Sequence, residues 1–298
     1  MTSDHLNKPL LGVGYALSAG LMLATMNMCA KLLTDIFNPI EITFYRNIVS
    51  IFFLISLVFL WKKISLLYKT KRPYAQLIRA VVGSTGMFFC IWAVLIMPLS
   101  VATAFIFTAP LFVTLLSPLI LKEKVGIIRI VSTFIGFSGV LLIAQPETIS
   151  EPWMILVGLA AGFFNGWVAI CLRWLGSSEH TVTTNFYFFL YGTIMTVLLF
   201  PFSGISVPPV ESYTIILGLG IAGLASLILK TQGFRYGPAS LISPISYTMI
   251  IWAVLFDYIF WQTTPTIYTL LGSSVIIGSN LFIIWREHRK NQEHLIEA

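Results

Sequence analysis

The sequence has little charge and few cysteines. Only 10% of its 298 residues are Asp, Glu, Lys or Arg, against roughly 25% in a soluble domain. Apolar residues make up 57%, more than a chain of this length can hide from water, which excludes a soluble globular protein. The same balance excludes intrinsic disorder. The three cysteines are odd in number and lie in apolar runs, so a secreted disulfide scaffold is excluded as well.

Motifs for catalysis and energy coupling are also missing. The chain has no Walker-type loop, so no ATP motor is encoded. Its four histidines lie near the termini or in predicted loops, which disfavours an intramembrane metal site. No Ser/His/Asp or Cys/His arrangement suits nucleophilic catalysis. We therefore expect no enzyme activity, no cofactor and no bound metal.

The chain is rich in long apolar runs, separated by charged or proline-containing stretches. A helix needs about 20 apolar residues to cross a bilayer, whereas outer-membrane strands alternate apolar and polar residues, a pattern these runs lack. Pro98 and Pro238 mark hinges within two of the runs. The sequence predicts an all-α integral membrane protein with ten transmembrane helices, at residues 9–30, 40–61, 75–97, 99–121, 126–145, 153–174, 181–201, 212–235, 239–261 and 266–285.

The positions of Lys and Arg predict the orientation of these helices. With the N-terminus in the cytoplasm, all of the 18 Lys and Arg residues except Lys31 and Arg46 fall on the inner side. Both termini are therefore predicted to be cytoplasmic (N-in/C-in). The net charge of +6 is then a topology signal rather than a sign of nucleic-acid binding, with polybasic lipid binding as an alternative. The N-terminal MTSDHLNKP lacks the features of a signal peptide, so we expect the first helix to be retained.

The two halves of the chain resemble each other. A shift of 142 residues places Ala16, Gly20 and Ala24 on Gly158, Gly162 and Gly166, and a shift of 140 places Pro98 on Pro238. Five helices is an odd number, so the second copy must enter the membrane from the opposite side. We therefore predict two inverted five-helix repeats, 1–148 and 149–298, an architecture found in many secondary transporters. The glycines form a double GxxxG, which predicts close helix packing.

Two longer segments carry a family resemblance. WAVLIMPLSVATAFIFTAPLFVTLLSPLILKEKV with GFSGVLLIAQP, and YGPASLISPISYTMIIWAVLFDYIFWQTTP with GSSVIIGSNLFIIWRE, resemble the two half-signatures of the drug/metabolite transporter (DMT) superfamily, EamA type. The resemblance implies ten helices, cytoplasmic termini and a central cavity lined by the third, fourth, eighth and ninth helices. The family often ends its ninth helix with Gly-Glu, where this chain has Gln262 and Thr263; the first-half acid, Glu123, is kept.

A few charged residues fall within the predicted spans, where an unpaired charge is costly. Arg46 is the principal candidate for binding substrate, because its planar guanidinium suits a carboxylate or phosphate. The alternative is a structural ion pair with Glu41 or Asp257, or snorkelling to the surface. Asp257 can take a proton, bind a cation or neutralise Arg46. Lys230 either contacts substrate or snorkels to the cytoplasmic face.

Polar and aromatic side chains complete the candidate set. Each of the polar ones can line the cavity or bridge two helices, and each of the aromatic ones can stack on a flat ligand or simply pack. The polar candidates are Asn27, Thr108, Asn165, Gln232 and Tyr247, and the aromatic ones are Tyr45, Trp92 and Trp167.

The most consistent function is secondary transport of a small organic metabolite across the cytoplasmic (inner) membrane by alternating access. The expected partners are this substrate and the lipid bilayer, with a homodimer as a further hypothesis. The branch with the IIWRE ending suggests a solute resembling S-adenosylmethionine, riboflavin or an amino acid. The alternatives are an efflux carrier for amphipathic compounds and, from other classes, a polytopic membrane enzyme, a channel or a scaffold.

Overall fold

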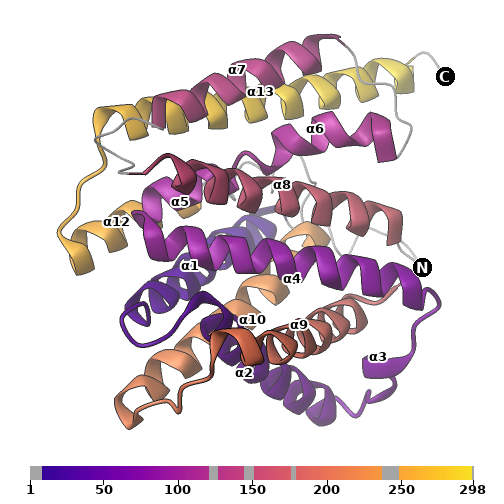
Figure 1. The fold of residues 1–298 in the computed structure, drawn as a ribbon. Coiled ribbons are helices and arrows are strands. Elements are labelled where there is room, and N and C mark those ends of the chain that lie inside the picture. The colour runs from indigo at the N-terminus through magenta and orange to yellow at the C-terminus, as the bar shows by residue number, and fades with distance from the viewer. Residues whose placement is uncertain (1–8, 121–126, 144–150, 176–178, 237–247, 297–298) are drawn as a thin grey trace.

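The computed structural model describes residues 9–120, 127–143, 151–175, 179–236 and 248–296, and they are helical with short connections (Figure 1). No strand occurs within these ranges. The helices are α1 (Pro9–Leu32), α2 (Pro39–Leu60), α3 (Ser65–Tyr68), α4 (Pro73–Ile96), α5 (Leu99–Ile106), α6 (Ala109–Ile120), α7 (Ile127–Ile143), α8 (Pro152–Leu175), α9 (Thr181–Ser203), the 3-10 turn η3 (Val210–Ser212), α10 (Tyr213–Tyr236), α12 (Met249–Trp261) and α13 (Ile267–Ile296).

The starts of several helices follow from their sequence. Pro39, Pro73 and Pro152 each open a helix, where the missing N–H of proline has no partner to lose. Asn38 caps α2, because its side chain accepts from the N–H groups of Ile40 and Glu41 while the Glu41 carboxylate accepts from the Asn38 N–H at 2.9 Å.

Seven segments of the described ranges are long and apolar enough to cross a bilayer. They lie in α1, α2, α4, α8, α9, α10 and the α5–α6 stretch. Shorter apolar helices cover Ile130–Val140, Met249–Trp261 and Ile267–Ser279. Large apolar side chains such as Phe52, Leu198 and Phe202 point outward, as expected where lipid replaces water. The chain is therefore a helical multi-pass membrane protein, and the count of ten crossings and the N-in/C-in orientation stay predictions.

The predicted helix 99–121 is wrong as a single helix. The chain breaks at Phe107 and Thr108 into α5 and α6. Pro110 has no N–H to give to the preceding turn, and the Phe105 carbonyl accepts from both the hydroxyl and the N–H of Thr108, at 2.6 Å and 3.0 Å. The Pro98 hinge is confirmed, since α4 ends at Ile96 and α5 begins at Leu99. Residues 239–247 of the predicted ninth helix lie outside the described residues.

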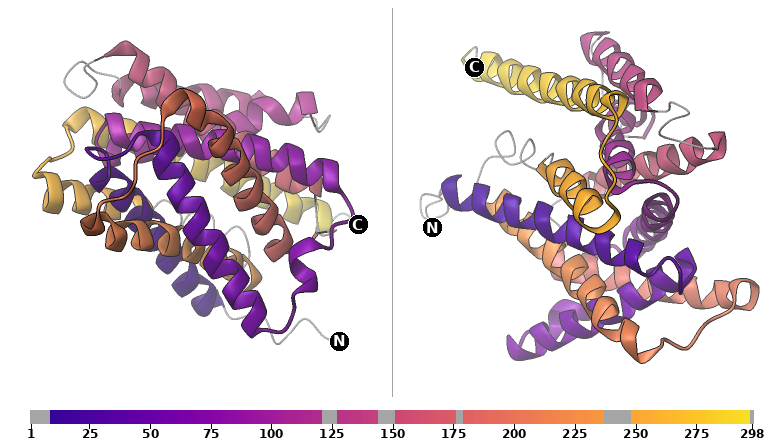
Figure 2. Two further views of the ribbon diagram at one scale, coloured as in Figure 1. Left: turned by 60° about the horizontal axis from the view of Figure 1, so that its bottom comes forward. Right: turned by 90° about the vertical axis from the view of Figure 1, so that its left-hand side faces the viewer.

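Helices of the first half pack on helices of the second half, and the pairs are related by the internal repeat. Extensive contacts join α1 to α10 and α8 to α4, which are equivalent pairs if α1 corresponds to α8 and α4 to α10. The contact of α6 with α8 matches that of α12 with α1, and α2 packs on its own counterpart α9. The pair α7 and α13 runs along one edge of the bundle, as Figures 1 and 2 show.

The glycines of α8 provide the predicted close approach. A Cβ on Gly158 would meet the Phe105 ring at 2.6 Å, and one on Gly166 would meet the Ala109 carbonyl at 2.7 Å. Gly162 lies against Thr108 itself. The break between α5 and α6 therefore packs against the glycine face of α8. In α1, the equivalent Gly20 lies against Thr248 and the first residue of α12, with a Cβ-to-Oγ1 distance of 3.4 Å.

Candidate functional site

Arg46 lies on α2 with only 1% of its surface exposed. Its Nη1 donates to the Asn47 side-chain oxygen at 3.0 Å, and its Cζ stands 5.4 Å and 5.5 Å from the ring centres of Phe188 and Phe189 on α9. Its Nε has no hydrogen-bond partner among the described residues. Such ring contacts stabilise a buried guanidinium only in part, so at least one of its N–H donors still lacks a hydrogen-bond acceptor.

The two acids considered as partners of Arg46 are engaged elsewhere. The Glu41 carboxylate accepts from the N–H groups of Asn38 and Ser206, so it holds the start of α2 to the segment after α9. Asp257 pairs with Lys31 at 3.2 Å. The proposed ion pair of Arg46 with Glu41 or Asp257 is therefore wrong for the described conformation, and so is snorkelling, because the guanidinium is buried within the bundle.

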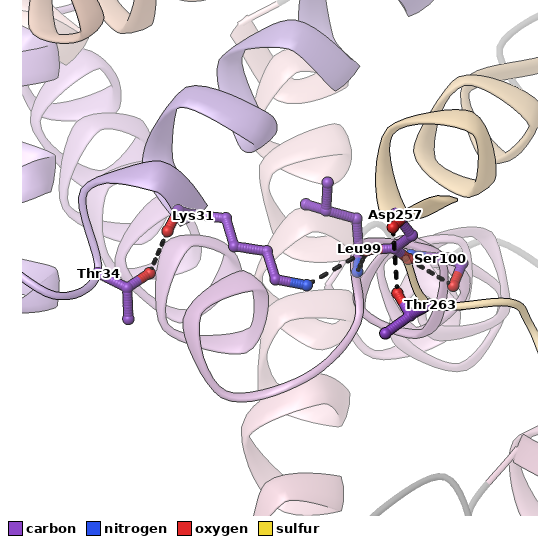
Figure 3. Close-up of polar contacts among 6 residues, drawn as sticks. All are labelled: Lys31, Thr34, Leu99, Ser100, Asp257 and Thr263. Atoms are coloured by element: carbon purple, nitrogen blue, oxygen red, sulfur yellow. Dashed lines mark hydrogen bonds and ion pairs between the residues drawn. The ribbon is translucent and has the colours of Figure 1, made fainter. Parts of the chain in front are cut away.

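Asp257 instead caps a helix of the other half (Figure 3). One carboxylate oxygen accepts from the Leu99 N–H at 2.9 Å and from Lys31, and the other accepts from the N–H and the hydroxyl of Ser100, both at 2.8 Å. Leu99 and Ser100 are the first residues of α5, whose free N–H groups favour an anion. The Lys31 ammonium also lies 4.5 Å from the Trp261 ring centre. This carboxylate therefore joins α1, α5 and α12, as a structural contact.

Arg79 is a buried guanidinium that was not among the predicted site residues. It lies on α4, is 5% exposed, and has its Cζ 4.5 Å from the Phe188 ring centre. Its Nε and Nη1 have no hydrogen-bond partner among the described residues. The charge pattern grouped it with the inner loop cations, although it falls inside the predicted span 75–97. Its place inside that span was the sequence signal that could have identified Arg79 as a buried charge. We call Arg46, Arg79 and Phe188 together the arginine site.

Three polar candidates on α1, α5–α6 and α8 have distinct environments. Asn27 is buried, and its Nδ2 has no partner among the described residues. Asn165 donates to the Cys90 sulfur at 2.9 Å and to the Ala161 carbonyl at 2.8 Å, and so links α8 to α4. Thr108 is used in the α5–α6 break. Asn27 thus keeps a free donor, whereas Thr108 and Asn165 serve the packing.

The tryptophan candidates stack on neighbouring rings. Trp92 and Phe89 lie nearly parallel, with ring centres 6.1 Å apart, and Phe89 stacks on Phe164 at 5.6 Å and 6°. Phe164 in turn stacks on Trp167 at 6.3 Å. This ladder joins α4 to α8. Tyr45 lies elsewhere and donates its hydroxyl to the Ser206 carbonyl at 2.6 Å, which links α2 to the segment after α9.

A pocket of about 870 Å³ lies at the opposite end of the bundle from the Asp257 cap, lined by residues of α2, α3, α9 and α10. Gln232 lines it, together with Leu54, Val182 and Ile228. These three apolar residues belong to the same packed cluster as Phe188 and Phe189, so the pocket and the arginine site adjoin one cluster. Lys230 is exposed, in keeping with snorkelling, and Tyr247 lies outside the described residues.

The comparisons with known proteins agree with this architecture. The profile of the EamA-like transporter family matches twice, over residues 10–145 and 152–285. An uncharacterized transporter of Helicobacter pylori (strain ATCC 700392 / 26695) is 33% identical over 93% of this chain and 95% of its own length. An S-adenosylmethionine uptake transporter of Rickettsia felis is 25% identical over 96% and 97%, and a pseudopaline exporter, CntI, of Pseudomonas aeruginosa is 24% identical over 89% and 93%.

A solved structure shares the fold. Described as "Crystal structure of protein", it superimposes with a TM-score of 0.64 at 19% identity, covering 93% of this chain and 98% of its own. At that identity the likeness concerns the fold alone. The two family matches together span nearly the whole chain, and the relatives align over nearly their full length. The chain therefore belongs to the EamA-like transporter family.

Proposed function

We propose that this protein is a secondary transporter that carries a small organic metabolite across the cytoplasmic membrane by alternating access. In this proposal ten helices form two inverted repeats, 1–148 and 149–298, with both termini in the cytoplasm. Support comes from the double family match and from helix contacts that exchange between the two halves. Repeats of this kind bind substrate near the middle of the membrane, where the halves meet.

The observation that carries the proposal is the difference between the two ends of the bundle. One end is tied by the Lys31–Asp257 pair and by the bond from the Ser206 N–H to Glu41, which join segments of different halves. The other end holds the pocket of about 870 Å³, and there the halves meet at the surface, where Glu179 accepts from the N–H groups of Lys71 and Arg72. A carrier that opens to one side at a time requires a closed end and an accessible end. The described conformation fits one open to the cytoplasm.

Within this proposal Arg46 is the main substrate contact and Gln232 lines the pocket, with Asn27, Lys230 and Tyr247 as further candidates. The names of the relatives show that family members handle different organic solutes, namely S-adenosylmethionine and pseudopaline. A solute resembling S-adenosylmethionine, riboflavin or an amino acid is the starting panel. Efflux of amphipathic compounds is the second candidate, because Trp61 lies at the pocket rim.

The test is counterflow in proteoliposomes loaded with a metabolite panel. A carrier gives saturable uptake of the labelled solute that depends on the same solute inside, and Arg46→Ala abolishes it. Arg286→Ala is the matched control, since Arg286 is an exposed guanidinium on α13. Flux that rises linearly with concentration would indicate a channel instead, and a folded protein that moves no member of a broad panel would count against transport.

A further inference from the structure

Within the described part of the chain, no acid pairs with the buried arginines. Of the 12 Asp and Glu residues, only Glu41 and Asp257 fall within the ten predicted spans. Glu41 is bound to two backbone N–H groups, and Asp257 to Lys31 and the start of α5. Residues 237–247, which lie outside the described ranges, contain no acid in their sequence. Arg46 and Arg79 therefore carry two positive charges that no acid among the described residues offsets.

The two guanidinium groups lie close to one another. Both stand over the Phe188 ring, at 5.4 Å and 4.5 Å from its centre, so their Cζ atoms are at most about 10 Å apart, a range over which buried like charges repel. A protein has little reason to hold two such charges together for stability alone, because removing buried charge in favour of apolar packing is often neutral or stabilising. Their proximity is better explained by a ligand.

Unused hydrogen-bond donors lie around the same point. Arg46 Nε, Arg79 Nε and Nη1, and the buried Ser84 hydroxyl have no partner among the described residues. Ser84 lies beside Asn47, since a Cβ on Gly192 would meet the Asn47 Nδ2 at 2.7 Å and the Ser84 Oγ at 2.8 Å. Buried donors left unsatisfied in this number are costly unless an acceptor occupies the site for part of the cycle.

Glycines leave room for both guanidiniums. A Cβ on Gly223 of α10 would lie 3.2 Å from Arg46 Nε, and one on Gly83 of α4 would lie 3.4 Å from Arg79 Nη1. These two glycines are 140 residues apart, the shift that relates Pro98 to Pro238. The arginine site is therefore held by equivalent positions of both halves, as a binding site at a repeat interface would be.

Resting on the proposed transport function, we propose that the arginine site binds an organic dianion, with carboxylate or phosphate groups facing Arg46 and Arg79. A guanidinium fork matches both groups geometrically. A monoanion would leave one charge unpaired, and a zwitterion would bring an ammonium to a site whose nearby acids are already engaged. The S-adenosylmethionine-like solute of the starting panel is thereby replaced by a dianion.

The experiment is thermal unfolding of the purified full chain with a graded ligand series. The series contains malonate, succinate, glutarate and adipate, with butyrate as the monoanion, glycerol phosphate as the phosphate arm, and S-adenosylmethionine and riboflavin as cationic and neutral arms. We expect a dicarboxylate of one chain length, or the phosphate, to raise the unfolding midpoint by several degrees, and the monoanion, cation and neutral arms to leave it unchanged. Comparing the dicarboxylates with glycerol phosphate shows whether the site binds carboxylate or phosphate groups.

Arg46→Met and Arg79→Met should each abolish this response while leaving the ligand-free midpoint equal or higher, since each removes an unpaired buried charge. Arg286→Met should respond as the wild type does. If a Met variant is not monodisperse, the corresponding Lys variant, Arg46→Lys or Arg79→Lys, is measured in its place, because it keeps the charge. Wild-type stabilisation by a cation or neutral solute alone, with saturable counterflow of that solute, would overturn the dianion and leave transport standing. A dianion response that survives both Met variants would overturn the site.

Discussion

Gly162 of α8 lies directly against the Thr108 hydroxyl, at the point where α5 gives way to α6. A Cβ at Gly162 would also come within 2.8 Å of the Phe105 carbonyl. Gly162→Ala is therefore expected to destabilise the protein by about 1–3 kcal/mol, the usual cost of overpacking a close contact. The unfolding midpoint in detergent measures this.

A matched control is available in the same chain. A Cβ added at Gly14 of α1 would have no atom within 4 Å, so Gly14→Ala meets open space. Because alanine is the better helix former, Gly14→Ala should leave the midpoint unchanged or raise it slightly. Equal losses for Gly162→Ala and Gly14→Ala would contradict the close contact at Thr108.

Replacing Lys31 and replacing Asp257 are expected to lower the free energy of unfolding by different amounts. Asp257→Ala leaves the N–H groups of Leu99 and Ser100 and the Lys31 ammonium without their acceptor, and is expected to cost about 3–5 kcal/mol. Lys31→Met leaves the carboxylate with three donors and should cost only about 1.5–3 kcal/mol. The midpoints of both variants and of the double variant measure this difference. Lys31→Arg, which keeps the pair, is the control, and a larger loss for Lys31→Met than for Asp257→Ala would refute the capping role.

The orientation of the bundle can be tested by labelling single cysteines. Lys63 lines the pocket, and Val207 is exposed in the segment after α9. In a background without the three native cysteines, Lys63→Cys should react with a membrane-impermeant maleimide only from the cytoplasmic side, and Val207→Cys only from the outer side. Reaction of both from one side, or the reverse pattern, would invalidate the predicted N-in topology.

Gly223 provides a test of how Arg46 is positioned. A Cβ there would lie 3.1 Å from the Met26 sulfur and 3.2 Å from Arg46 Nε, both ends of flexible side chains. Gly223→Ala should thus cost less than about 1 kcal/mol of stability while raising the KM for transported solute several-fold. On the same helix, Gly218→Ala meets only the Cys29 sulfur at 3.4 Å and should change neither quantity. An unchanged KM in Gly223→Ala would remove the case for Arg46 as a substrate contact.

The local features of this fold could be predicted because their causes are local. Pro39, Pro73 and Pro152 open helices, and Pro98 divides the long uncharged run, as their backbone chemistry requires. The break at Thr108 was missed because apolar composition continues through it, although Pro110 follows two residues later. The structure adds the fit of Thr108 against Gly162.

Pairing across the two halves could not be read from the sequence in the same way. Asp257 and Arg46 each have the character of a buried site residue, but which cation meets which acid depends on how α1, α5 and α12 converge. Arg79 was counted with the inner-side cations because it stands near one end of its span, although packing on Phe188 buries it. The family resemblance supplied the architecture, and the side-chain contacts supplied the candidate ligand chemistry.

The exchange of helix contacts between the halves has a consequence for biosynthesis. Because α1 packs mainly on α10 and α4 mainly on α8, the early helices enter the membrane before their main partners have been translated. Lipid must cover their faces until the later helices arrive, and assembly then resembles the docking of two subunits joined by a tether. An interruption of synthesis after the first half would leave its interface exposed to a second truncated chain.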